Sequence, residues 1–397
     1  MTSGLTAVER ALRTAAPYAL LDALREHLAR SYGVATTELL LADYSLTVLQ
    51  QVTDLPLTAP PVSVHSSAPG RAFGSQQPHA EAADDTGRVL LHLPVTVRGD
   101  RLGVLSLSLD GDALTPERRD ELGEIAEMLG HHILVAERDT DLYLQARRKD
   151  RLTLAAEMQW QLLPARACAR EEYAIGAQLE PAYAIRGDNF DWSATEDRLT
   201  LAVTNGMGEG IDAALLTNLA VNALRNARRA GVAIADQAAL ADQALYAQYR
   251  GDAHLSVLLL EFHLDTGLVE IVDAGSPQLH RLRDGVVEHL PFVAQLPLGL
   301  ADDTPYEAQR IRVRPGDRLI FVSDGVHAVA SRSGEVYGHA ALARAIQSTR
   351  LLPAAEVPRA ILTELAAHRD DEPLDDALIV CLDWYGRHPA PADAHPR

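Results

Sequence analysis

The fold of this chain is decided by an apolar run that ends on an acidic turn, Leu319-Ile320-Phe321-Val322-Ser323-Asp324-Gly325. The apolar run predicts a buried β-strand, and the Asp-Gly pair is a turn signal at its end. Other acidic residues have a similar placement, since Asp188 and Asp191 lie in a predicted turn and Asp375-Asp376 precede a strand that begins at Ala377. Carboxylates that several strand ends deliver to one point suit a hard divalent cation such as Mg²⁺ or Mn²⁺.

Each of these acidic motifs is weak by itself, because Asp-Gly and Asp-Asp pairs are more often turns or solvated loop acids than metal ligands. The segment Gly206-Met207-Gly208-Glu209-Gly210 is similarly open to two interpretations, an anion cradle or a tight strand-to-helix turn. The sequence contains no H-E-x-x-H and no C-x-x-C motif, so it offers no His/Cys metal site as an alternative to the carboxylate site. The functional interpretation therefore depends on the order and spacing of the motifs together.

Strands and helices recur in runs after Pro164, which ends the preceding helical pattern. The hydrophobic patterns predict strands at 198–204, 255–264, 268–273, 310–323 and 377–383, with a hairpin around Asp284-Gly285. They predict helices at 211–230 and 237–249 and a helical pair at 339–368. Strands in hairpins with long helices between them favour an α+β layered sandwich over a parallel Rossmann sheet.

The residues before this region predict a second, smaller α+β domain. An amphipathic helix follows Pro17, strands are expected at 38–52 and 87–109, and Thr115 caps a closing helix. Residues 131–163 contain no Gly or Pro, so we expect one long connecting helix, either a passive solvated linker or a coiled coil. The predicted boundaries are 1–136 for the first domain, 137–163 for the connecting helix, 164–385 for the second domain and 386–397 for a disordered tail.

The composition predicts a soluble globular protein with full cores. Of its 397 residues, 47% are hydrophobic and 23% are charged, and the formal net charge is −19. This charge repels nucleic acid and anionic membranes, and no apolar run approaches membrane-spanning length. Only two cysteines, Cys168 and Cys381, are present, so a disulfide framework is excluded and a reducing cytoplasm is expected.

Taken in order, the motifs of the second half resemble the SpoIIE/RsbU-like stress-response and sporulation branch of the bacterial PPM phosphatases. The resemblance covers roughly residues 155–384, and the preceding residues resemble a GAF domain at the level of the fold only. The motifs that carry the resemblance are Gln159-x-x-Leu162-Leu163-Pro164, Pro181-Ala182, Gly187-Asp188, Asn205-Gly206-Met207-Gly208, Ala274-Gly275, Pro297-Leu298-Gly299, Pro315-Gly316-Asp317, Ser323-Asp324-Gly325 and Asp375-Asp376.

The resemblance implies a PPM-type αββα sandwich, with two Mn²⁺ or Mg²⁺ ions at one end. It also implies a metal-activated water that attacks phosphoserine or phosphothreonine in line, without a covalent intermediate. Residue by residue, the catalytic and metal-ligand positions of the family fall on Asp188, Asp324 and Asp375, and a backbone carbonyl ligand falls on Gly206. Asp191 and Asp376 are expected to be supporting acids.

One expected ligand differs, because the family normally has Asp before the Gly-x-Gly turn and this chain has Asn205 at that metal position. An amide offers one neutral oxygen and bridges two cations poorly, so metal affinity should fall and one ion could be lost. Arg186, Ser276 and His327 also depart from the pattern, where Gly, His and Glu are usual. Deamidation of Asn205-Gly206 would regenerate a carboxylate.

Two functions follow from these residues. The first is a sensor-regulated protein serine/threonine phosphatase, whose substrate by resemblance is a phosphorylated anti-sigma factor antagonist. The second is a degenerate pseudophosphatase that binds a phosphoprotein or a regulatory partner without turnover. A homodimer through the connecting helix is a further expectation about its partners.

Overall fold

The computed structural model describes residues 2–53, 59–82, 87–331, 334, 336–338, 340–369 and 375–387. The chain divides into two compact units, residues 1–151 and 152–397, each with its own core. None of the helices in the described residues combines the length and the hydropathy that a membrane span requires.

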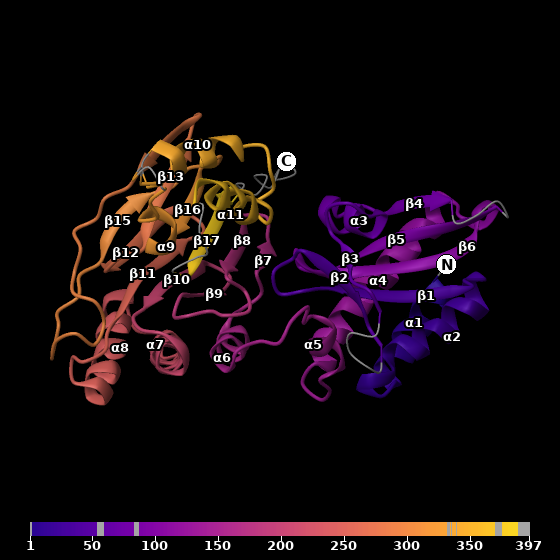
Figure 1. Ribbon diagram of the computed structural model, residues 1–397, viewed down its shortest axis with the longest axis horizontal. Helices are drawn as coiled ribbons and strands as arrows, with labels where there is room; N and C mark the ends of the chain where they lie inside the picture. Colours follow the sequence, from indigo (N-terminus) through magenta and orange to yellow (C-terminus); the bar gives the residue numbers. More distant parts are fainter. Residues whose placement is uncertain are drawn as a thin grey trace, which may run out of the picture. The chain divides into compact units, whose positions relative to one another are not determined.

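The first unit is one antiparallel sheet with helices on both faces. The sheet order is β3-β2-β1-β6-β5-β4, and α1, α2 and α4 share a core with one face while α3 packs on the other (Figure 1). The predicted cap is confirmed, since the Thr115 hydroxyl accepts a hydrogen bond from the Arg118 amide. The elements are α1 (Thr2–Thr14), η1 (Pro17–Ala19), α2 (Leu20–Tyr32), β1 (Thr36–Ala42), β2 (Val48–Gln51), β3 (Val62–Ser63), α3 (Ala68–Ser75), β4 (His79–Ala82), β5 (Arg88–Val97), β6 (Asp100–Asp110), η2 (Gly111–Ala113), α4 (Pro116–Ala136) and α5 (Leu142–Ala146).

The single connecting helix predicted for 131–163, including the 137–163 segment, is wrong. α4 ends at Ala136, α5 is a separate short helix, and α6 (Leu154–Leu162) begins after Thr153, whose hydroxyl accepts from the Ala156 amide. The interruptions fall at Asp139-Thr140-Asp141 and at Thr153, where short polar side chains compete with helical backbone hydrogen bonds. A coiled coil through one continuous helix therefore has no basis in this segment.

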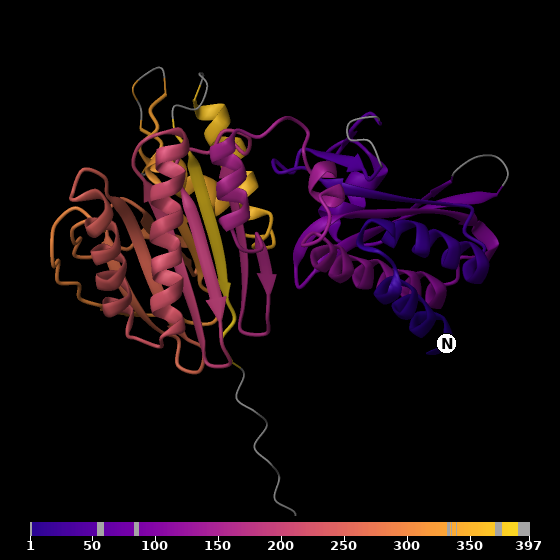
Figure 2. The same cartoon turned by 90° about the horizontal axis from the view of Figure 1, so that it is seen from below.

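The second unit consists of two antiparallel sheets between two layers of helices. One sheet has the order β15-β12-β11-β10-β9 and packs against α7 and α8, and the other has the order β14-β13-β16-β17-β8-β7 and packs against α10 and α11 (Figures 1 and 2). The inner faces of the sheets meet, for example, where the rings of Phe262 and Trp384 stack with centroids 5.8 Å apart. This arrangement confirms the predicted αββα sandwich.

The elements of the second unit match the predicted strands with one exception, and they include three strands, at 167–169, 173–180 and 189–194, that were not predicted. They are α6, β7 (Ala167–Ala169), β8 (Tyr173–Glu180), β9 (Asn189–Ala194), β10 (Arg198–Gly206), α7 (Gly210–Arg229), α8 (Ile234–Tyr249), β11 (Leu255–His263), β12 (Leu268–Ala274), β13 (Gln278–Arg283), β14 (Val286–His289), β15 (Gln309–Arg312), β16 (Arg318–Val322), α9 (Asp324–His327), α10 (Ala340–Ser348), α11 (Val357–His368) and β17 (Ala377–Trp384).

The exception is the strand predicted at 310–323, which is two strands in different sheets. A turn at Pro315-Gly316-Asp317 separates β15 from β16, with Gly316 at φ +94°. The carboxylate of Asp317 accepts from the Arg314 amide and pairs with Arg283, which fixes the turn. Of the predicted tail, Gly386 and Arg387 bond to Glu172, and 388–397 lie outside the described residues.

Candidate metal centre

The predicted site residues meet at one end of the sandwich. Asp188 lies just before β9, Asp324 begins α9 directly after β16, Asp375 lies just before β17, and Asn205 and Gly206 end β10. The Asn205 amide contacts the Asp324 carboxylate, and the Gly206 amide donates to the Gly187 carbonyl at 3.3 Å. Loops that are far apart in the sequence therefore bring these residues together.

Asp188 is the most buried of these acids, with 3% of its surface exposed. Burial raises its pKa well above the usual value, and the neighbouring charges of Asp376, Asp324 and Asp375 raise it further, while a hydrogen bond with Ser323 lowers it. Its Oδ2 atom is buried and has no hydrogen-bond partner in the part of the chain that the structure describes. A buried, unpaired carboxylate oxygen among other carboxylates suits a divalent cation ligand.

Asp324 and Asn205 form a direct pair. The Asn205 side-chain nitrogen donates to Asp324 Oδ1, which also accepts from the Gly325 amide at 2.9 Å. In this orientation the side-chain NH2 group of Asn205, and not its carbonyl oxygen, faces the Asp324 carboxylate. The pair therefore compensates part of the negative charge at the position where the family has a further carboxylate.

Asp375 remains accessible to solvent. Burial of part of its carboxylate raises its pKa, a hydrogen bond from the Asp376 amide lowers it, the Asp324 charge raises it, and the guanidinium of Arg186 lowers it. Arg186 itself lies 4.0 Å from Glu209, at the start of α7. Arg186, which departs from the family pattern, therefore places a positive charge beside Asp375.

Asp376 has a structural role at this site. Its Oδ2 atom accepts hydrogen bonds from the backbone amides of Arg186, Gly187 and Asp188, at 2.5, 2.8 and 3.2 Å. Burial raises its pKa to about 6, against the lowering effect of these three donors. Asp376 thus fixes the loop that presents Asp188.

Glycines make the close approach of the two ligand loops feasible. A Cβ atom on Gly187 would lie 2.4 Å from the Gly206 carbonyl oxygen, and one on Gly206 would lie 2.6 Å from Thr217 Oγ1. The Thr217 hydroxyl in turn donates to the Gly187 carbonyl at 2.8 Å. Any side chain at either position would separate the loop of Asp188 from the end of β10.

Asp191 does not join this cluster, so its expected role as a supporting acid there is wrong. Its carboxylate is 4% exposed and pairs with Arg225 at 2.7 Å and with Arg228 at 2.8 Å, both on α7. These ion pairs attach α7 to β9. The sequence gave no local signal for them, because Arg225 and Asp191 are 34 residues apart in the chain.

A second group of metal-binding residue types, which the sequence did not predict, lies on β11 and β12. The Nε2 atom of His263 is 3.9 Å from a carboxylate oxygen of both Glu261 and Glu270. Glu261 already pairs with Arg198, and Glu270 pairs with Arg310 at 2.6 Å. Because two guanidinium groups neutralise the two carboxylates, we assign this group as an ion-pair network.

Comparison with known proteins identifies the second unit. Residues 195–385 match the family model described as Stage II sporulation protein E (SpoIIE). Over 260 residues the chain is 22% identical to phosphoserine phosphatase RsbU of Bacillus subtilis (strain 168), and the match covers 65% of this chain and 77% of RsbU.

Two of the solved structures that resemble this chain are a PP2C domain and a pair of RsbU and RsbW domains. The SiaA-PP2C domain of Pseudomonas aeruginosa has a TM-score of 0.49 and 21% identity, with coverage of 58% of this chain and 93% of that domain. The RsbU and RsbW domains of Rv1364c from Mycobacterium tuberculosis have a TM-score of 0.48 and 22% identity, with coverage of 55% of this chain and 63% of theirs. This chain thus spans less than two thirds of the mycobacterial structure.

The family match, the relationship to RsbU and the αββα architecture agree. The second unit of this chain therefore carries a SpoIIE-family PPM phosphatase domain, matched over residues 195–385, which is homologous to the phosphoserine phosphatase RsbU.

Proposed function

We propose that the second unit hydrolyses phosphoserine or phosphothreonine in a phosphoprotein. The observation that carries this proposal is the cluster of Asp188, Asp324 and Asp375, in which Asp188 keeps a buried oxygen without a partner in the described residues. These three carboxylates and the Gly206 carbonyl would hold Mg²⁺ or Mn²⁺. The bound cation would supply a water of lowered pKa and neutralise charge on the phosphoryl oxygens.

The substrate that we propose is a phosphorylated anti-sigma factor antagonist. The resemblance of the motifs to the stress-response and sporulation branch supports this assignment, and so does the homology to the phosphoserine phosphatase RsbU. The first unit is proposed to be a GAF-like sensor domain, which would make the activity dependent on a signal.

Contacts of α6 offer a route for such regulation. The Trp160 indole donates to the Ala182 carbonyl at 2.7 Å, and the Gln159 side chain accepts from Asn189 at 2.9 Å. Arg225 on α7 donates to the Leu162 carbonyl at 2.6 Å. Because these contacts surround the loop of Asp188, a shift of α6 would alter the ligand geometry.

The alternative function is a pseudophosphatase that binds a phosphoprotein or a regulatory partner without turnover. One observation favours it, which is that Asn205 donates to Asp324 in place of providing a carboxylate. Deamidation does not readily remove this difference, because Asn205 and Gly206 lie in β10 and the Gly206 amide is held by the Gly187 carbonyl.

Phosphate release from a phosphoserine peptide with Mn²⁺ tests the proposal. We expect turnover by the native protein and a loss of about 100-fold or more in Asp375→Asn, because a charged oxygen ligand is lost. The matched control is Asp265→Asn, an exposed acid in the turn between β11 and β12, which should retain the native rate. Peptide binding without any phosphate release would instead support the pseudophosphatase.

A further inference from the structure

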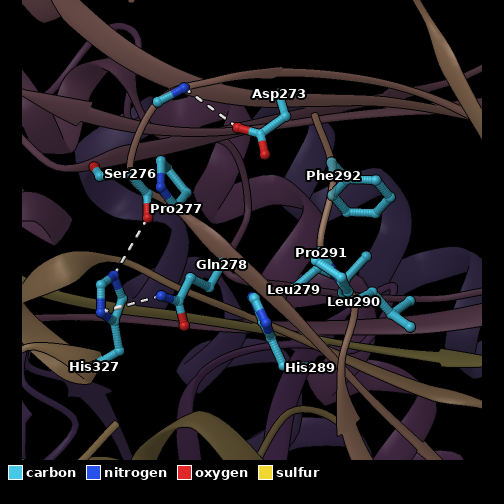
Figure 3. Close-up of a pocket in the computed structure, with 11 residues that line it drawn as sticks. Asp273, Ser276, Pro277, Gln278, Leu279, His289, Leu290, Pro291, Phe292 and His327 are labelled. Carbon is cyan, nitrogen blue, oxygen red and sulfur yellow. Dashed lines mark hydrogen bonds between the residues drawn. The ribbon is translucent and has the colours of Figure 1, made fainter. Parts of the chain in front are cut away.

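A pocket of about 340 Å³ lies in the second unit (Figure 3). Its walls come from the end of β12 and the loop that follows, the start of β13, the segment after β14, and α9. The residues that matter for its chemistry are Asp273, Ser276, Gln278, Leu279, Phe292 and His327. The volume is at the lower end of the range of pockets that hold small ligands.

Two connections place this pocket next to the metal centre. A Cβ atom on Gly275 would lie 2.2 Å from Ser256 Oγ, and Ser256 is the register partner of Asn205 on the neighbouring strand. On the other side, His327 is the last residue of the short helix α9 that Asp324 begins. When a phosphorylated residue of the substrate lies at the metal centre, the substrate residues next to it would therefore lie close to this pocket.

Asp273 is the unusual residue in the pocket. It is 9% exposed, and one carboxylate oxygen accepts a hydrogen bond from the Gly275 amide at 3.3 Å. No Lys, Arg or His of the described residues forms an ion pair with it, and burial raises its pKa. Figure 3 shows the second carboxylate oxygen directed into the space between Pro277 and Phe292. A buried carboxylate is costly unless a cation compensates it.

The other walls suit the stem of a long basic side chain. Phe292, which is partly exposed, offers apolar surface for methylene groups, and an aromatic face also attracts a cation. His327 does not compete with the ligand for Asp273. Its Nε2 donates to the Ser276 carbonyl at 3.3 Å, so Nδ1 accepts from the Gln278 amide at 3.4 Å (Figure 3).

We propose that this pocket is a substrate subsite for a lysine or arginine side chain that lies near the phosphorylated residue, with Asp273 as its ionic partner. The inference rests on the proposed phosphatase function and specifies its substrate class, a phosphoserine or phosphothreonine segment with an adjacent basic residue. The net charge of −19 also favours the approach of a basic segment.

The test uses the full chain and a set of phosphoserine peptides in which one lysine is moved through each position on either side of the phosphoserine. The matched peptides carry norleucine, which keeps the methylene stem and removes the charge. At one position we expect kcat/KM to be about tenfold higher for lysine than for norleucine, the magnitude of one charge-assisted hydrogen bond. The lysine preference should disappear in Asp273→Asn and persist in Asp265→Asn.

Equilibrium binding separates this subsite from the proposed activity. The same peptides, carrying a fluorescent label, are titrated with metal-free protein, and their binding is measured by fluorescence anisotropy. This measurement reports a preference for lysine even if the protein releases no phosphate. Equal binding and equal kcat/KM for lysine and norleucine at every position would overturn the proposal. A preference for glutamate over lysine, or a lysine preference that survives in Asp273→Asn, would overturn it as well.

Discussion

The substitution Asn205→Asp tests how this site differs from its family. In the structure the Asn205 side-chain nitrogen donates to the Asp324 carboxylate. The substitution removes this donor and places two carboxylates in contact. Without metal, the free energy of unfolding should fall by about 2 to 4 kcal/mol at neutral pH, because a hydrogen bond to a charged acceptor is worth about 1.5 to 3 kcal/mol and like-charge repulsion adds to its loss.

With metal, the same substitution should have the opposite effect. An additional charged oxygen attracts a divalent cation by several kcal/mol, and desolvation offsets most of this gain. We expect a net gain of about 1.4 to 2.8 kcal/mol, which corresponds to Mn²⁺ binding that is about ten- to a hundredfold tighter. Saturating Mn²⁺ should therefore restore the stability that the variant loses in its metal-free form.

The assay is urea denaturation of the native and variant proteins with chelator and with Mn²⁺, together with calorimetric titration of Mn²⁺. The matched control is Asn222→Asp, the same change at an exposed position on α7. The reasoning is refuted if Asn205→Asp behaves like Asn222→Asp in both measurements. Metal-dependent turnover that arises only in Asn205→Asp would favour the pseudophosphatase as the native function.

Three further predictions concern the stability of the two units. Tyr143→Phe should lower the free energy of unfolding by about 1 kcal/mol in urea denaturation, because the Tyr143 hydroxyl donates to the Pro17 carbonyl at 2.9 Å. Tyr173→Phe should not lower it in the same assay, because the buried Tyr173 hydroxyl has no hydrogen-bond partner among the described residues. Burial raises the pKa of both phenols to about 12, so stability present below about pH 10 should be lost as the pH rises through 12, in step with tyrosinate absorbance. Arg225→Leu should cost about 2 kcal/mol in the same denaturation assay, because Asp191 keeps only one of its two partners; an unchanged midpoint would contradict the buried ion pair.

The sequence predicts the layered fold because hydrophobic periodicity reports which residues face a core. The helices α7 and α8 and the hairpin at Asp284-Gly285 lie where their patterns place them. Periodicity does not report which sheet a strand joins, so the segment at 310–323 was predicted as one strand. It also does not report tertiary anchors such as the burial of Tyr143 in the first unit, which accompanies the break in the connecting helix.

The sequence predicts where the acidic residues lie relative to the strands, but it predicts less well which groups each of them contacts. Asp324 follows an apolar strand directly, so its exposure at a strand end could be read from its neighbours. Asp376 precedes β17 and Asp191 lies within β9, and their partners are far away in the chain, namely backbone amides for Asp376 and arginines for Asp191. Asp273 gave no signal at all, because the lack of an ionic partner for its buried carboxylate among the described residues becomes apparent only in the folded structure.

Calorimetric titration of Mn²⁺ into the full chain, with p-nitrophenyl phosphate turnover followed in the same samples, tests the central claim most directly. The account predicts that the native protein binds Mn²⁺ and hydrolyses the phosphate ester, and that Asp324→Asn loses both. Native protein that neither binds Mn²⁺ nor turns over the ester, or an Asp324→Asn variant that retains both, would contradict it.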